Sequence, residues 1–363
     1  MAKFLKQNTP YMEILEHICY AGVIRLQDIE VFSVGKSSTS NTYARYLNWL
    51  AKPETYKIKK GRSSIKIYEG VVLRRYGMRG SYRLSRRFLP VLKALIPEAV
   101  EFYETNYMDN IKSDREKAVR INKVASIYTF ISATQIPFIR ENIEADTAFY
   151  PIKTYREDVE EKARLGTSKT VGVLKGADRK YVVYREFDKF RTRSKAENKT
   201  IVNITLQNSD NVRRAILIGE NYEHAKQTIT AWIASDSKTR TNLFTIKPLS
   251  EIFDLLYFLP DDAEGVELCN LIPYGIEDLA KKIYGQESIR SIFDQESDTE
   301  IITVMPIFDI SRMIKICTSG YKPDKTRKFI TTRSAAKPIR EMLPDTKLNI
   351  EYLTTEQIKD FLT

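Results

Sequence analysis

The apolar residues of the first 95 positions change from helical to alternating spacing at Pro53, and this change constrains the fold most strongly. Residues 11–23 have apolar side chains at helical spacing, and Gly22 supplies a natural stop. Residues 26–32 are long enough for a second short helix, and a third is expected over about residues 38–51, after a polar turn rich in capping residues. Pro53 cannot continue that third helix, so three helices are predicted before the first strand.

Beyond Pro53 the sequence alternates β-branched or aromatic residues with basic ones. The segments TYKIKK and IKIYEGVVLRRYG, separated by the turn GRSS, have the pattern of a half-exposed hairpin, and YRLS offers a third short strand. Helix, helix, turn, helix and hairpin is the order of a winged helix-turn-helix. We therefore predict such a domain over residues 1–95, with the third helix in the major groove and the hairpin on the flanking backbone.

Charge is distributed unevenly along the chain. Residues 1–95 hold 18 Lys and Arg against 6 Asp and Glu, a balance of +12, whereas the remaining residues hold 40 against 41. Residues 56–87 alone carry eleven basic side chains and one acid, with four tyrosines between them. Such a segment is typical of a surface that binds a polyanion, and we expect double-stranded DNA as the partner. A solvated charged surface is the alternative interpretation.

The predicted DNA contacts fall into two groups. Those of the turn and the outer face of the third helix are Lys36, Ser37, Ser40, Asn41, Thr42, Arg45 and Asn48. Those of the basic hairpin are Lys57, Lys59, Lys60, Arg62, Lys66, Arg74, Arg75 and Arg79. The amides and Arg45 can meet base edges, while the hairpin lysines and arginines can neutralise phosphates.

Several short strings carry a resemblance to a known family. The helix containing YARYLNWLAK, the basic hairpin and the following YRLSRRF resemble the N-terminal module of the replication-relaxation-like proteins of Gram-positive plasmids and integrative or conjugative elements. AVRINKVASIY and LGTSKTVGVLKGADRKYVVYREF resemble the helix and hairpin that follow in that family. The resemblance implies a DNA-binding accessory factor or regulator in replication or transfer of a mobile element. It supplies no catalytic motif.

The remainder of the chain predicts an α+β or mixed α/β fold. Residues 96–115 have the pattern of a connecting helix, broken near Pro97, and a linker. Residues 116–363 alternate strand and helix signals, including a strand-to-helix step from RAILIG to NYEHAKQTITAWI, and predict an α/β region with a mixed sheet. A break near residues 275–300 would divide it into two subdomains.

The sequence gives little indication of a site for a metal or a cofactor. Cys19, Cys269 and Cys317 lie far apart, and His17 and His224 form no ligand motif, so we expect no metal. Gly35-Lys36-Ser37 looks like the end of a phosphate-binding loop, but Glu30 stands where that motif needs glycine, so we expect no cofactor.

Two other functions stay open beside DNA reading. One is an enzyme, such as a tyrosine-dependent initiator or relaxase that nicks DNA. A nuclease would use Glu186, Asp188 and Lys189, but their spacing would place Glu186 and Lys189 on opposite faces of a strand. The other is an interaction protein that recruits replication or transfer proteins. We favour a protein that is not an enzyme; a homodimer is compatible with this interpretation.

Two further segments of the chain are rich in basic residues. Residues 320–341 have the composition of a basic loop that either contacts nucleic acid or is only solvated, and residues 185–199 carry a similar set of bases.

No apolar run reaches the ~18 residues of a membrane span, and the N-terminus lacks the apolar core of a secretory signal, so a cytoplasmic protein without a membrane partner is expected.

Overall fold

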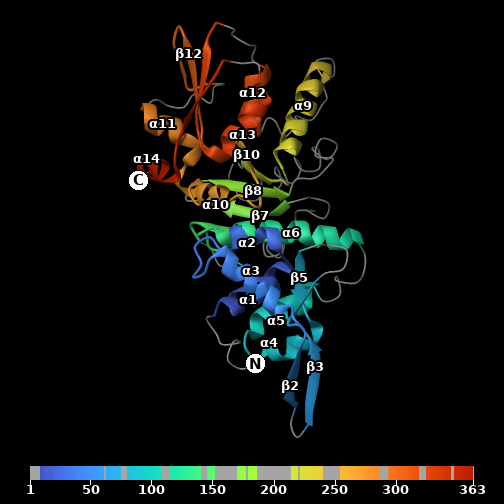
Figure 1. Cartoon of the computed structure of the whole chain (residues 1–363). Coiled ribbons are helices and arrows are strands. Elements are labelled where there is room, and N and C mark those ends of the chain that lie inside the picture. The colour runs from blue at the N-terminus through green and yellow to red at the C-terminus, as the bar shows by residue number, and fades with distance from the viewer. Residues whose placement is uncertain are drawn as a thin grey trace. The chain divides into compact units, whose positions relative to one another are not determined.

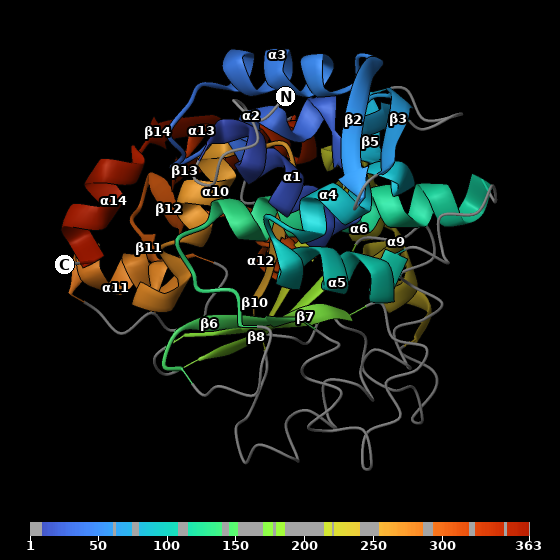
Figure 2. The same cartoon turned by 90° about the horizontal axis from the view of Figure 1, so that it is seen from below.

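The computed structural model has a mixed α/β fold in two compact units (Figures 1 and 2). It describes residues 9–60, 63–74, 80–107, 115–139, 145–151, 170–176, 179–185, 214–219, 221–239, 254–285, 293–318, 324–344 and 347–362. The N-terminal unit comprises residues 1–134 and the C-terminal unit residues 135–363.

Three predicted helices begin the N-terminal unit and are confirmed. They are α1 (Pro10–Ala21), a 3-10 turn (Leu26–Asp28) that continues into α2 (Ile29–Phe32), and α3 (Ser40–Leu50). Helix α1 ends at Gly22, which has a φ of 84° and whose N–H donates to the Ile18 carbonyl. A side chain at position 22 would also meet the ring of Tyr107 at 2.8 Å, so both the positive φ and the close packing require glycine there.

The strands of this unit form two separate sheets. The strands β2 (Glu54–Lys60) and β3 (Ser63–Glu69) make an antiparallel hairpin that projects away from the helices (Figure 1). The strands β1 (Ile24–Arg25), β4 (Val72–Arg74) and β5 (Ser81–Leu84) form a three-stranded antiparallel sheet with β5 in the centre. The single hairpin expected from Thr55 to Gly77 is therefore wrong at its end, because VVLR leaves β3 and pairs with β5 instead.

Two helices beyond residue 88 complete the core of the N-terminal unit. Helix α4 (Leu89–Lys93) and helix α5 (Pro97–Tyr107) are separated just before Pro97, as expected. Val100 and Tyr103 are buried in the same apolar cluster as Leu15 and Leu47. The compact unit thus extends to residue 134 and includes the segment 96–115 that the sequence suggests as a connector, because apolar residues of α5 complete its core.

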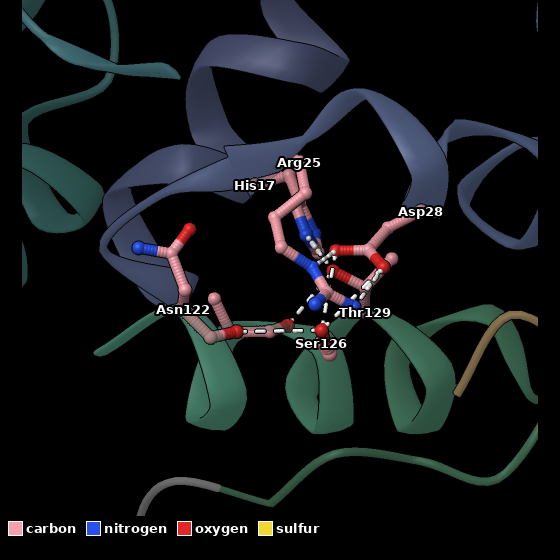
Figure 3. Close-up of polar contacts among 7 residues, drawn as sticks. His17, Arg25, Asp28, Asn122, Ser126 and Thr129 are labelled. Atoms are coloured by element: carbon pink, nitrogen blue, oxygen red, sulfur yellow. Dashed lines mark hydrogen bonds and ion pairs between the residues drawn. The ribbon is translucent and has the colours of Figure 1, made fainter. Parts of the chain in front are cut away.

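Helix α6 (Arg115–Ala133) packs on α1, α2 and β1 through polar contacts that are withdrawn from solvent (Figure 3). The carboxylate of Asp28 is fully buried and accepts from the guanidinium of Arg25 at 2.6 and 2.8 Å. Ser126 of α6 donates to the same carboxylate at 3.3 Å, and Thr129 is hydrogen-bonded to His17 at 2.9 Å. These contacts fix α6 to α1 through His17 and to the segment that leads into α2 through Asp28.

The first sheet of the C-terminal unit is mixed and five-stranded. Its order is β10 (Asp254–Phe258), β9 (Arg214–Ile218), β8 (Lys180–Arg185), β7 (Thr170–Lys175) and β6 (Ala148–Pro151). The strands β6, β7 and β8 form an antiparallel meander, whereas β8, β9 and β10 are parallel. Helix α9 (Tyr222–Thr239) connects β9 to β10, so the predicted strand-to-helix step is confirmed.

The second sheet is also mixed, with β11 (Gln295–Glu296) antiparallel to β12 (Glu300–Met305), followed by parallel β13 (Thr326–Thr331) and β14 (Leu348–Tyr352). Helix α12 (Ile310–Thr318) and helix α13 (Arg333–Met342) make the crossovers. The basic loop expected over residues 320–341 is wrong from residue 326 onward, where β13 and then α13, capped by Thr332, take its place. Leu217 of the first sheet and Phe329 of the second share one apolar cluster, so a common core spans the expected break near residues 275–300.

Shorter helices complete the C-terminal unit. They are α10 (Ala263–Cys269), the 3-10 turns Ile272–Tyr274 and Ile276–Asp278, α11 (Leu279–Tyr284) and α14 (Thr355–Leu362). Across the described ranges, every helix is too short or too polar to cross a membrane.

Candidate nucleic-acid interface

Helix α3 has one face in the core and one in solvent. Tyr43, Leu47 and Leu50 are buried against α1 and α2. Asn41 and Arg45, one turn apart on the opposite side, are exposed. In Figure 2, α3 runs along the outer edge of the N-terminal unit. The two side chains expected to lead base contacts are therefore presented together by a helix whose position is fixed by packing.

The N-terminus of α3 is held by its own polar residues. Thr39 caps the helix by accepting from the Thr42 N–H at 3.4 Å, and the two threonine hydroxyls are 3.0 Å apart. Thr42 and Ser40 are only half-buried. Of the predicted contacts in this turn, Thr42 thus has a structural role in the cap that competes with any contact to DNA.

The turn before α3 presents Lys36 and Ser37 to solvent. The Lys36 ammonium lies 4.7 Å from the ring centroid of Phe32, a cation–π distance, and Ser37 donates to Glu13 at 3.4 Å. The Lys36 N–H donates to the Ser33 carbonyl, so the backbone here is a compact turn. Gly35-Lys36-Ser37 is therefore a turn between α2 and α3, a position from which Lys36 can reach a phosphate.

Glu13 of α1 joins this turn to the helix that follows. Its second carboxylate oxygen accepts a short hydrogen bond from the Tyr43 hydroxyl. Burial, and then the bond to Glu13, raise the pKa of Tyr43 to about 12. The phenol stays protonated near neutral pH, and it serves to orient α3 on α1.

Asn48, on the same helix as Asn41 and Arg45, has a hydrogen-bond partner inside the N-terminal unit. It is half-buried, and its side-chain oxygen accepts from the Tyr82 hydroxyl of β5 at 2.8 Å. The expectation that Asn48 reads bases beside Asn41 and Arg45 stays a prediction, although its side-chain oxygen already has a partner within the fold. Helical spacing alone does not reveal a strand that arrives from 34 residues away.

Sequence reasoning missed an aromatic group beside Arg45. The ring centroid of Tyr11 lies 4.1 Å from that of Tyr46 and 5.1 Å from that of Trp49. The guanidinium carbon of Arg45 is 5.7 Å from the Tyr46 ring centroid. The three rings are half-buried, and the guanidinium of Arg45 lies over the ring of Tyr46. The signal is present in the sequence as Tyr46 and Trp49, three residues apart on one helix face.

The hairpin residues are located in the fold by their strands. Lys57, Lys59 and Lys60 lie in β2, with Lys57 paired to Lys66 of β3 in register. Arg74 ends β4, while Arg62, Arg75 and Arg79 lie outside the described residues. The predicted hairpin bases within the described residues are thus divided between β2–β3 and β4.

Some exposed bases of the N-terminal unit lie outside the predicted set. Lys52 follows α3 directly, and Arg86 and Arg87 lie in the 3-10 turn Arg86–Phe88 after β5. All three are exposed. The basic surface of this unit therefore includes positions beyond the predicted helix and hairpin.

The residues considered for catalysis are the set Glu186, Asp188 and Lys189, and the tyrosines. Glu186, Asp188 and Lys189 lie outside the part of the chain that the structure describes. Within that part, no three His, Cys, Asp or Glu side chains gather as metal ligands. Six tyrosines are fully buried, in keeping with core packing, namely Tyr43, Tyr82, Tyr103, Tyr181, Tyr184 and Tyr257.

Comparison of the chain with protein-family models, curated proteins and solved structures found no match in any of the three.

Proposed function

We propose that the N-terminal unit is a winged helix-turn-helix that reads double-stranded DNA with α3. The observation that carries the proposal is the exposure of Asn41 and Arg45 on a helix whose other face is fixed by Tyr43, Leu47 and Leu50. A base-reading side chain needs a rigid support, because a misplaced donor loses its partner on the base edge. Arginine pairs best with guanine and asparagine with adenine, so the pair has the chemistry to distinguish bases.

The order of elements supports the same proposal. Helix, short strand, helix, helix and paired strands follow one another, and β1 pairs with β5, which arrives after the third helix. In this arrangement α2 and α3 form the helix-turn-helix and α3 is the recognition helix. The β2–β3 hairpin is an addition between α3 and the three-stranded sheet.

Backbone contact is assigned to the basic hairpins. The β2–β3 hairpin carries Lys57, Lys59, Lys60 and Lys66 on a projection that leaves the helical core (Figure 1). Lysine is a point charge that suits phosphate oxygens without reading sequence. These residues, with Lys36 in the turn before α3, would set the position of the helix on the duplex.

The biological role that we propose is an accessory factor or regulator in replication or transfer of a mobile genetic element. It rests on the resemblance to replication-relaxation-like proteins of Gram-positive plasmids and conjugative elements. The protein would act by occupying its site on DNA. Replication or transfer proteins are the partners that such occupancy would recruit.

Selection from a random duplex library with the full-length chain tests the proposal. We expect a recurring motif from the wild-type chain and the same motif from a Lys282→Ala control, since Lys282 is an exposed base on α11 of the other unit. An Arg45→Ala chain should return a degenerate motif. Recovery of an unchanged motif from the Arg45→Ala chain would overturn the assignment of α3 as the reading helix.

A further inference from the structure

Three basic side chains of the C-terminal unit form a line on one helix. Arg333, Lys337 and Arg340 occupy positions four and three residues apart on α13, and all three are exposed. Positions spaced in this way lie on one face of a helix. We call these three residues the α13 stripe.

The opposite face of α13 explains why the stripe points to solvent. Ala335, Ala336 and Ile339 are buried, and Ala335 and Ile339 belong to the large core cluster of the unit. At the start of the helix, the Thr332 side chain accepts from the Ala335 N–H and its hydroxyl donates to the Pro306 carbonyl. The helix therefore holds its three charges on a fixed backbone.

Neighbouring bases in the same segment are already engaged. Lys325 is 2.7 Å from a carboxylate oxygen of Glu296, and Lys328 is 2.7 Å from one of Glu351. Arg327 is only 8% exposed. The segment thus contains bases that serve the fold and, separately, the three bases of the stripe. On α13 these three outnumber the one acid, exposed Glu341, while the half-buried Glu264 of α10 accepts from Ser334 beside Arg333.

Tyr352 extends the stripe at its C-terminal end. Its hydroxyl accepts from Arg340 at 2.8 Å, and the Arg340 guanidinium carbon is 5.8 Å from its ring centroid. The ring is 43% exposed. This contact orients Arg340 and leaves other guanidinium N–H groups available to an anion.

We propose that the α13 stripe binds the sugar-phosphate backbone of duplex DNA without reading its sequence. At 1.5 Å per residue the stripe spans ~10 Å, and each strand of duplex DNA presents a phosphate about every 3.4 Å of axis, so about three phosphates fall within reach. Asn and Gln, which would read bases, do not occur in α13. A surface for single strands would need several exposed rings for stacking, whereas the aromatic contact of this stripe is the one between Arg340 and Tyr352.

The inference goes beyond the proposed function, because it gives the C-terminal unit a DNA contact of its own. It rests on that function only for the choice of duplex DNA as the occupant. Two independent contacts in one chain would lengthen the footprint or allow one chain to hold two segments of DNA.

The test measures binding of the full-length chain to a duplex of unrelated sequence as a function of salt. The variant carries Arg333→Ala, Lys337→Ala and Arg340→Ala together. We expect the slope of log affinity against log salt to become shallower by about two to three units, since each phosphate contact contributes about 0.9. The preference for a selected motif over the unrelated duplex should stay within about twofold of wild type, because phosphate contacts carry no sequence information.

Two controls make the result specific. A chain with Lys281→Ala, Lys282→Ala and Lys359→Ala loses the same charge from exposed positions on α11 and α14, and should keep the wild-type slope. A chain with Arg333→Lys and Arg340→Lys keeps the charge and should also keep the slope. Circular dichroism of each variant verifies that the fold is retained.

The outcomes separate this inference from the proposed function. The inference is overturned if the stripe variant has the same salt slope as wild type, or if both triple variants change the slope equally. It is also overturned if the stripe substitutions weaken binding only to a single-stranded oligonucleotide or an acidic polypeptide. If the stripe substitutions flatten the salt slope while Arg45→Ala leaves the selected motif unchanged, the role of α3 is overturned and the stripe is supported. Absence of any duplex binding by wild type would overturn both.

Discussion

The Tyr82 hydroxyl donates a 2.8 Å hydrogen bond to the side-chain oxygen of Asn48, joining the central strand β5 to the proposed reading helix α3. Tyr82 is only 2% exposed, so this bond forms at the edge of the core. It makes Asn48 part of the support of α3 and leaves Asn41 and Arg45 as the exposed polar pair. Predictions about stability and about DNA reading can therefore be separated residue by residue along one helix.

Tyr82→Phe should lower the free energy of unfolding by about 1 kcal/mol, because the ring still packs but the side-chain oxygen of Asn48 loses this donor. Chemical denaturation monitored by circular dichroism measures the change. Tyr274→Phe is the matched control, since Tyr274 is 69% exposed and its hydroxyl contributes no core packing. Equal stability of the Tyr82→Phe and wild-type chains would show that the bond contributes nothing.

Arg45→Ala should reduce the preference for the selected duplex over an unrelated one by about 1 to 3 kcal/mol, the usual contribution of one good base contact. Asn48→Ala, three residues further along the helix, should lower stability and leave the preference unchanged. Fluorescence anisotropy on both duplexes measures the two effects. A larger loss of preference for Asn48→Ala than for Arg45→Ala would contradict the exposed and half-buried assignments.

Hairpin substitutions should act on all duplexes alike. Lys59→Ala, Lys60→Ala or Arg62→Ala should weaken specific and unrelated duplexes about equally and flatten the salt dependence by roughly one unit for each phosphate that is no longer neutralised. Salt titrations of each variant measure the slope. A change in the selected motif after any of these substitutions would mean that the hairpin, and not α3, reads the bases.

Local signals in the sequence are sufficient for the first three helices of the N-terminal unit and for the step from strand to helix in the C-terminal unit. Helical spacing before Pro53 predicts α1 to α3, and the step from RAILIG into a helix predicts β9 and α9. Each of these elements carries its own pattern of apolar residues and its own start or stop residue. Such patterns depend on a few neighbouring positions and can be interpreted without knowing the rest of the fold.

The features that sequence reasoning missed depend on distant parts of the chain. Ile24 pairs with Tyr82 in the three-stranded sheet, and the Tyr82 hydroxyl reaches the side-chain oxygen of Asn48 on α3. Burial of Tyr103 extends the unit past its expected boundary for the same kind of reason. Helix α13 is a different case, because Pro338 is atypical of a helix interior even though the cap residue Thr332 is visible in the sequence.

Asp28→Ala should destabilise the N-terminal unit by about 3 to 5 kcal/mol, because it leaves the guanidinium of Arg25 without its buried partner. Asp28→Asn should cost less, since the amide oxygen can still accept from Arg25 or Ser126 (Figure 3). Thermal and chemical unfolding measure both. Glu104→Ala, which breaks the exposed ion pair with Lys93, is the control and should have a much smaller effect.

Asp309 should make the stability of the C-terminal unit depend on pH. It lies between β10 and α12, where it accepts from the backbone N–H groups of Leu255 and Arg312. Burial, and then the nearby charge of Asp254, raise the pKa of Asp309 to about 6 in the folded chain. The unfolded chain has the ordinary carboxyl pKa, about 3.9.

The sign of the effect follows from proton binding. Between about pH 4 and pH 6 the folded chain binds more protons at Asp309 than the unfolded chain does, so its contribution to the free energy of unfolding falls as pH rises. Asp309→Asn keeps an acceptor oxygen and cannot ionise. We expect its free energy of unfolding, relative to wild type, to rise by up to roughly 2 to 3 kcal/mol from about pH 4 to about pH 6.5 and then to level. Urea unfolding at a series of pH values measures this, and Asp298→Asn, at an exposed position, should track wild type throughout. Parallel curves for Asp309→Asn and wild type would mean that Asp309 titrates alike in both states and that its burial carries no electrostatic cost.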